Sequence, residues 1–130
     1  MGAEQEYFLV PLEHYRKRKD LFICGRTLFG APAPKGQEFE DHYFSAINER
    51  VAGFMQELDE SLWRLGVQAK IKHSEVAPGQ FELVPVFNTC NVANDQNQLV
   101  MACMNNIALR ETLQRGERQR QAHQLVDWDG

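Results

Sequence analysis

The sequence has few of the features that mark a secreted or membrane-bound chain. Its three cysteines, Cys24, Cys90 and Cys103, are an odd number with no C-x-x-C spacing. That argues against a disulfide framework and against a thiolate metal site. No cationic stretch followed by an apolar one resembles a secretory signal, and no apolar run approaches the ~20 residues that span a membrane. We therefore expect a soluble, cytoplasmic chain with no membrane partner.

Positive charge is also scarce. The 130 residues include 14 lysines and arginines against 18 aspartates and glutamates, for a net charge of −4. Nucleic-acid-binding domains are usually basic, so nucleic acid is not expected as a partner. The length is that of one domain, and 43% hydrophobic and 25% charged residues are ordinary for a globular protein.

The order of hydrophobic patterns predicts an α+β fold, in which a mostly antiparallel sheet packs against two helices. Apolar residues at helical spacing predict a long helix over 38–65 and a second helix over 91–113. Short β-rich runs at 4–10 and 20–25 predict strands. The core expected from these patterns comprises Phe44, Ile47, Val51, Phe54, Leu58, Leu62, Val76, Phe81, Leu83 and Ile107.

Two segments are expected to lack regular structure. Glycine and proline are too dense over 25–36 for a helix or strand, so this segment is predicted to be a loop. The last residues, 115–130, are rich in Gln and Arg and have no apolar face, which predicts a frayed tail.

The stretch HSEVAPGQFE, residues 73–82, raises the question of function. Pro followed by Gly is typical of a type II turn, so we expect a turn at 77–80 between strands at 68–76 and 80–87. In that register Glu75 faces Glu82. Directly opposed residues have Cβ atoms ~5 Å apart, where like charges destabilise the pair. The repulsion calls for a compensating group.

Two further glutamates, Glu4 and Glu6, alternate along the first predicted strand and therefore point to the same face. For any one glutamate, a solvated surface position is the better interpretation. Four of them on largely buried strands would repel one another unless cations neutralised them. Hard divalent ions, above all Mg²⁺ or Mn²⁺, take such all-oxygen ligands. A neighbouring residue, His73, could assist a metal, although a local hydrogen bond is the simpler interpretation.

These features together resemble the catalytic domain of glutamine synthetase, and the motifs are most similar to those of the type III class. The resemblance covers most of the chain, from about residue 4 to residue 108. It is carried by the E-x-E strand (4–6), GRTLFGAP (25–32) with PKGQ (34–37), DHYF (41–44), EVAPGQFE (75–82) and FNT (87–89).

The resemblance implies ligands and a reaction. By it, Glu6, Glu75 and Glu82 hold a first divalent cation. Glu4 belongs to a second cation that bridges the ATP phosphates, and Phe87 packs by the adenine. The family reaction uses ATP to phosphorylate the γ-carboxylate of glutamate, after which ammonia displaces phosphate. Metal ions that clamp phosphoryl oxygens suit such chemistry. The resemblance also implies a homo-oligomer.

The sequence departs from the family in what it lacks. A downstream His and Glu for the second cation, and several arginines, are missing from this chain. No catalytic residue is therefore assigned, and we expect the chain alone to be inactive as a glutamate–ammonia ligase. Residues 1–109 are interpreted as a partial catalytic domain and residues 110–130 as a polar tail unlike the family.

Two other interpretations stay open. The chain could be a catalytically inactive remnant that acts as a metal-binding or self-assembling module. A metal-dependent phosphoesterase would use the same carboxylates, but the sequence offers no candidate nucleophile and no Asp-rich motif.

Overall fold

The computed structural model describes residues 1–114 and 122–126, with side chains as far as Arg110. The elements follow in the order β1 (Gln5–Pro11), α1 (Leu12–Lys17), α2 (Lys19–Cys24), the 3-10 helix η1 (Glu38–Phe44), α3 (Glu49–Arg64), β2 (Ala69–Ser74), β3 (Gln80–Pro85), α4 (Cys90–Gln114) and β4 (Ala122–Val126). Among the described helices, none is both long and apolar enough to span a membrane.

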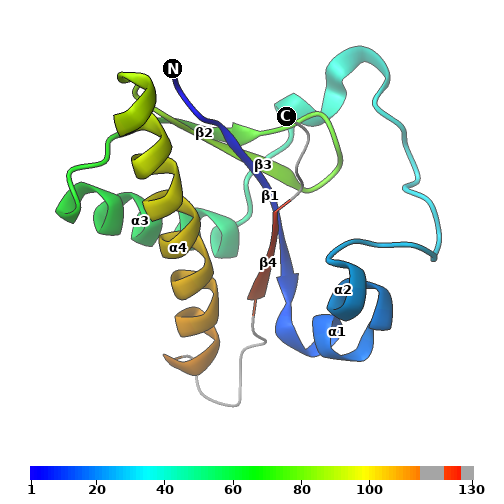
Figure 1. Ribbon diagram of the computed structural model, residues 1–130. Helices are drawn as coiled ribbons and strands as arrows, with labels where there is room; N and C mark the ends of the chain where they lie inside the picture. Colours follow the sequence, from blue (N-terminus) through cyan, green and yellow to red (C-terminus); the bar gives the residue numbers. More distant parts are fainter. Residues whose placement is uncertain (115–121, 127–130) are drawn as a thin grey trace.

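A four-stranded antiparallel sheet in the order β2-β3-β1-β4 forms the centre of the fold (Figure 1). Helices α3 and α4 pack against one face of this sheet, and the short helices α1 and α2 lie at its far end (Figure 1). The predicted α+β class, with a mostly antiparallel sheet against two helices, is therefore confirmed.

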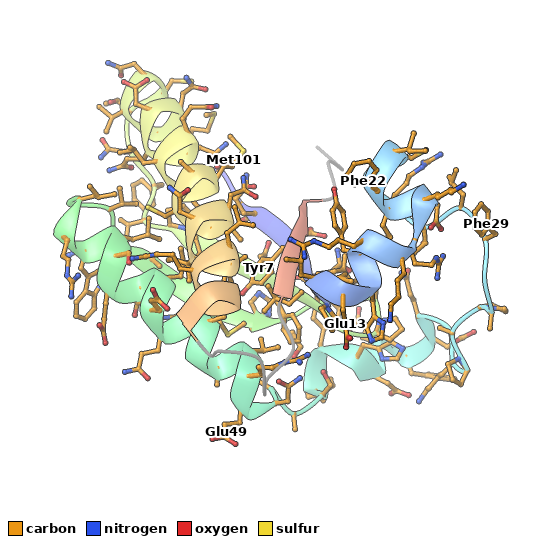
Figure 2. All side chains as sticks on the ribbon, turned by 90° about the horizontal axis from the view of Figure 1, so that it is seen from below. Tyr7, Glu13, Phe22, Phe29, Glu49 and Met101 are labelled. Carbon is orange, nitrogen blue, oxygen red and sulfur yellow. The ribbon has the colours of Figure 1, made fainter. Side chains whose placement is uncertain are left out.

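The alternation of side chains along β1 and β3 gives the sheet two different faces. Tyr7, Phe81 and Leu83 are buried against the two helices, and Tyr7 lies between the strands and α4 (Figure 2). Residues one position away in sequence, including Glu6 and Glu82, point to the opposite face because the side-chain period of a strand is two. The buried core cluster consists of Tyr7, Val51, Phe54, Met55, Leu58, Leu62, Val67, Phe81, Leu83, Val100, Met104, Ile107 and Ala108.

The long first helix starts later than its apolar pattern predicts. Helix α3 begins after Asn48, whose side chain accepts a hydrogen bond of 3.0 Å from the backbone N–H of Val51, an N-cap of the usual kind. It ends where Gly66 adopts φ 77°, with Val67 N–H bonded to the Leu62 carbonyl. The predicted start at 38 was wrong because the asparagine cap supplies a stronger local signal than the apolar spacing before it.

The late start removes one predicted core residue. Phe44 ends the 3-10 helix η1 and is 87% exposed, while Val76 is only half-buried in a loop. Ile47 packs partly against the core. The other predicted core residues are buried as expected: Val51, Phe54, Leu58, Leu62, Phe81, Leu83 and Ile107.

The second predicted strand, at 20–25, is instead helix α2. The Asp20 carboxylate is 3% exposed and accepts hydrogen bonds from Arg18 and from the backbone N–H of Leu28. Gly25 then ends the helix with φ 71°. A short apolar run does not distinguish strand from helix by itself. Here Asp20 and Arg18 hydrogen-bond to Leu28 and Phe29 of the Gly- and Pro-rich loop, and these contacts favour the helix. The loop at 25–36 has no helix or strand, as predicted.

The segment expected to be a frayed tail contains a strand. Helix α4 continues to Gln114, and β4 pairs antiparallel with β1, with Leu9 opposite Gln124. The edge of β1 otherwise offers unpaired backbone groups, which readily accept another strand. Backbone pairing, which needs no apolar face, explains why composition did not predict β4. The rest of the tail, 115–121 and 127–130, lies outside the described residues.

The packing of α3 against the sheet should dominate the stability of the chain. Leu58 is fully buried at the centre of α3, so Leu58→Ala should lower the free energy of unfolding by about 2–5 kcal/mol. Phe39→Ala, at a site that is 91% exposed, should change it by less than about 0.5 kcal/mol. Urea unfolding of both variants measures the difference, and equal losses would contradict this core.

Candidate metal centre

The turn inside HSEVAPGQFE forms where the sequence predicts it. The Gln80 backbone N–H donates to the Ala77 carbonyl at 3.1 Å, and Gly79 has φ 75°, the left-handed conformation that a type II turn requires at this position. The glycine is needed here because a side chain would be strained at such a φ.

The strand register beyond the turn differs from the prediction by two residues. Glu75 N–H bonds to the Gln80 carbonyl at 2.9 Å, and Glu82 lies opposite His73. The predicted pairing of Glu75 with Glu82 was therefore wrong. A type II turn matches the twist of a two-residue hairpin poorly, and the loop instead has four residues, because Val76 and Ala77 join Pro78 and Gly79 in it.

The central strand β3 has a charged or polar partner on each side of Glu82. On β1 the residue opposite Glu82 is Glu6, and on β2 it is His73. The like-charge pair that the sequence assigned to Glu75 and Glu82 is thus formed by Glu6 and Glu82, across a different pair of strands. His73 supplies a compensating group on the other side.

Glu75, Glu82 and His73 form a compact cluster at this end of the sheet. His73 Nε2 and Glu82 Oε2 share a hydrogen bond of 2.6 Å, and His73 Nε2 lies 3.5 Å from Glu75 Oε1. One ligand atom from each of the three residues lies within 4.8 Å of the others. Both glutamates are buried, at 7% and 6% exposed. The local hydrogen bond expected for His73 is confirmed, and the histidine also belongs to the cluster.

The other two predicted ligands lie on the same face. Glu6 is half-buried, and its Oε2 accepts a hydrogen bond from Gln80 Nε2, which orients the carboxylate. Glu4 is exposed and lies close enough to Glu82 to affect its protonation. The structure therefore brings the four predicted glutamates to one face of the sheet, with Glu82 at the centre.

The environment of Glu82 disfavours its negative charge. Burial, as the main cause, together with the neighbouring carboxyl groups of Glu4 and Glu75, raises the pKa of Glu82 to about 7, while the hydrogen bond with His73 acts in the opposite direction. A buried carboxyl group with so high a pKa gains more from a bound cation than an exposed one does, because the cation removes the cost of its charge.

Sequence reasoning gave Tyr43 no role, although it lies over the cluster. The Tyr43 ring stacks on the His73 ring, with centroids 6.4 Å apart and planes 15° from parallel. Burial and a hydrogen bond with Glu75 raise the pKa of the Tyr43 hydroxyl. Tyr43 belongs to the DHYF motif, which the sequence analysis identified. The contacts of Tyr43 follow only from the path of η1 back over the sheet.

The predicted nucleotide-binding residue lies apart from the cluster. Phe87 follows the end of β3 and is 75% exposed, so most of its ring is accessible. Its backbone neighbour Asn88 exchanges hydrogen bonds with Met1 at 2.7 Å and 2.9 Å, which ties this segment to the start of β1.

The sheet packs one face on helices and carries a cluster of carboxylates on the opposite face, the type of oxygen donor that hard divalent cations prefer. Comparison with known proteins is more specific. Residues 1–115 match the model of the glutamine synthetase catalytic domain. The chain belongs to the glutamine synthetase family.

Three relatives show the extent of the similarity. The chain is 59% identical over 108 residues to a glutamine synthetase of Butyrivibrio fibrisolvens, and 54% identical over 108 residues to one of Bacteroides fragilis. It is 47% identical over 113 residues to a type-3 glutamine synthetase of Dictyostelium discoideum. The matches cover 83–87% of this chain, which spans about 15% of the length of each relative.

The raised pKa of Glu82 predicts a pH-dependent stability in the presence of EDTA. Below about pH 4.5 the carboxyl group is protonated in both the folded and the unfolded chain, so its burial has no charge cost. Between pH 4.5 and 7 the folded chain retains a proton that the unfolded chain loses, so stability falls as pH rises. Relative to wild type, Glu82→Gln should therefore gain up to about 3 kcal/mol at pH 8 and little at pH 4.

The measurement is urea unfolding of both proteins across this pH range. Glu60→Gln makes the same change of charge at an exposed position of α3 and serves as the control. A stability difference between Glu82→Gln and wild type that is independent of pH would show that Glu82 has an ordinary pKa.

Proposed function

We propose that this chain forms the metal-binding part of a glutamine synthetase catalytic domain, in a protein that uses ATP to join ammonia to glutamate through a γ-glutamyl phosphate. The observation that carries the proposal is the register of β1, β2 and β3. It sets Glu6, Glu82 and His73 side by side on the face of the sheet opposite α3 and α4.

The residues present fit a hard divalent cation, Mg²⁺ or Mn²⁺. Glu6, Glu75 and Glu82 offer carboxylate oxygens, the preferred ligands of such ions. Two of these carboxylates are already oriented, because Gln80 donates to Glu6 and the Val76 backbone N–H donates to Glu75. A bound cation would supply neutralisation of charge on phosphoryl oxygens. In the proposed site, Glu82 would exchange its bond with His73 for a metal ligand bond, and Tyr43 would hold Glu75 in place.

The proposed nucleotide side of the site involves Glu4 and Phe87. By the family resemblance, Glu4 is assigned to a second cation on the phosphate side, and its exposed position next to Glu82 is compatible with this role. Phe87 is assigned to the adenine, for which its exposed ring offers a stacking surface. Glutamate, ammonia and ATP are the proposed substrates, and the cytoplasm is the proposed location.

Self-association is also part of the proposal. Several large apolar side chains are exposed away from α3 and α4, and Phe22 and Phe29 are two that Figure 2 shows. Apolar surface of this extent is unusual on a monomer and supports a homo-oligomer. The division of the chain into a partial catalytic domain, 1–109, and a tail, 110–130, remains a prediction.

Divalent cation should stabilise the chain if the cluster binds it. Ligand that binds only the folded state stabilises by mass action, by about 2.7 kcal/mol when Mn²⁺ is at 100 times its dissociation constant. For wild type, and equally for Glu60→Gln, the melting temperature in Mn²⁺ should therefore be higher than in EDTA. In Glu82→Gln most of that shift should be lost. Equal shifts in all three proteins would place the cation elsewhere.

Catalysis by the isolated chain is expected to be undetectable. The cluster supplies carboxylates for one cation, whereas the downstream His, Glu and Arg residues that the family resemblance implies are not in this sequence. ATP-dependent glutamine formation and γ-glutamyl transfer should both stay at background in the presence of Mn²⁺. Measurable transfer by the pure chain would refute this and would favour a complete site. Background activity together with a higher melting temperature in Mn²⁺ is also expected for the alternative function, a metal-binding or self-assembling module.

A further inference from the structure

Two surface segments carry exposed aromatic residues beside charges of opposite sign. The first contains the run RKRK at 16–19, which joins the end of α1 to the start of α2. This run contrasts with the net charge of −4 of the whole chain. Arg16, Lys17 and Lys19 are exposed, and none of the three pairs with an acidic group in the part of the chain that the structure describes.

Helix α2 presents apolar side chains next to this positive charge. Lys19, Phe22 and Ile23 are three and four residues apart, so they share one face of the helix. Phe22 and Ile23 are 67% and 73% exposed. The buried Asp20 carboxylate, which bonds to Arg18 and to the following loop, holds the helix in place beneath them. The α2 surface, formed by Lys19, Phe22 and Ile23, is therefore basic, apolar and preformed.

The second segment is the start of η1, where the charge is negative. Glu38 and Glu40 flank Phe39, which is 91% exposed, and neither glutamate pairs with a cation among the described residues. Phe39 and Glu40 have φ of 59° and 57°, a left-handed conformation that bulky L residues rarely adopt. This strain gains no burial for Phe39 within the chain. Strained backbone of this kind is concentrated at functional positions, and aromatic rings are enriched at protein interfaces.

The two surfaces do not cover each other within one chain. Figure 1 shows α1 and α2 after the end of β1, whereas η1 (cyan) lies beside β2. Phe22 and Phe39 accordingly both remain exposed. Contact of either surface with its own counterpart on a second copy would bring like charges together, which opposes association. Contact between the α2 surface of one copy and the η1 segment of another brings opposite charges and exposed apolar side chains together.

We propose that copies of this chain associate head to tail, the α2 surface of one docking on residues 38–40 of the next. Phe39 packs on Phe22 and Ile23, and the glutamates beside Phe39 face Lys19. This inference rests on the self-association proposed above and names the two surfaces that meet. Because the surfaces differ, a dimer leaves one of each kind unused. Assembly therefore continues to a closed ring or an open chain.

The first test is sizing of the full chain in EDTA at increasing protein concentration, which should show species larger than a dimer. Phe22→Asp and Phe39→Asp should each weaken association at least about tenfold, the scale expected for loss of a central anchor. Lys19→Glu should weaken it as well. Adding Glu38→Lys to Lys19→Glu should restore part of the association, because the charge pair is then reversed.

An equimolar mixture of Phe22→Asp and Phe39→Asp tests the head-to-tail geometry. The first variant keeps an intact η1 segment and the second an intact α2 surface, so one complete contact can form between them. The mixture should give a dimer with one copy of each, at concentrations where either variant alone is a monomer. Absence of this dimer would overturn the proposal, since contacts between like surfaces give no such rescue.

Controls separate this contact from unfolding and from self-association in general. Leu65→Asp changes another exposed apolar residue, and it should leave association and the circular dichroism spectrum unchanged. Unchanged association in Phe22→Asp and Phe39→Asp would overturn this contact while leaving a homo-oligomer in place, whereas a monomer at every concentration would refute both. Binding to anionic lipid vesicles that Lys19→Glu abolishes, without self-association, would also overturn the proposal, since it would assign the basic surface to a membrane.

Discussion

The pairing of β3 with β1 on one side and with β2 on the other is the constraint on which the rest of this structure depends. It sets Glu82 between Glu6 and His73 in one row across three strands. The same pairing directs Phe81 and Leu83 toward the helices. A shift of one residue in either pairing would exchange the two faces, exposing the apolar residues and burying the carboxylates in the core. The core and the site are thus specified together.

The site costs stability, and the other face of the sheet offsets this cost. A buried carboxyl group whose pKa is raised to about 7 is destabilised when ionised. Tyr7, Phe54 and Leu58 on the core face contribute the burial that keeps such a group in place. His73 reduces the cost through its hydrogen bond with Glu82. A cation would replace that partial compensation with a fuller one, which is why metal binding and folding should be coupled in this chain.

The length of the short loop between β2 and β3 decides which side chains meet. With Val76 and Ala77 in the loop, Glu75 leaves the position opposite Glu82, and His73 takes it. Glu75 then approaches Tyr43 and His73 from the end of the strand. The result is a cluster of two carboxylates and an imidazole, in place of two facing carboxylates. The helix-backed sheet keeps this geometry because η1 returns over the cluster and stacks Tyr43 on His73.

Local signals in the sequence were enough for the turn at 77–80, for helix α4, for most of α3 and for the choice of four glutamates as candidate ligands. Each depends on residues close together in the chain: Pro78 and Gly79 for the turn, apolar spacing for the helices, and alternation for Glu4 and Glu6. Family motifs added the assignment of those ligands. The start of α3 was also encoded locally, by the Asn48 cap, but the apolar spacing begins before this residue and led to a start that was too early.

Other features depend on partners that are distant in sequence, and only the tertiary structure decided them. The Asp20 carboxylate accepts from the backbone N–H of Leu28, in the loop beyond α2, a contact that the apolar run at 20–25 does not reveal. β4 needs the open edge of β1, which no composition reveals. The register of Glu82 was decided by Glu6 and His73 on two other strands, and the role of Tyr43 by the path of a loop. Residue identity determines which groups can bind a cation, whereas backbone pairing between separated strands determines which of them meet.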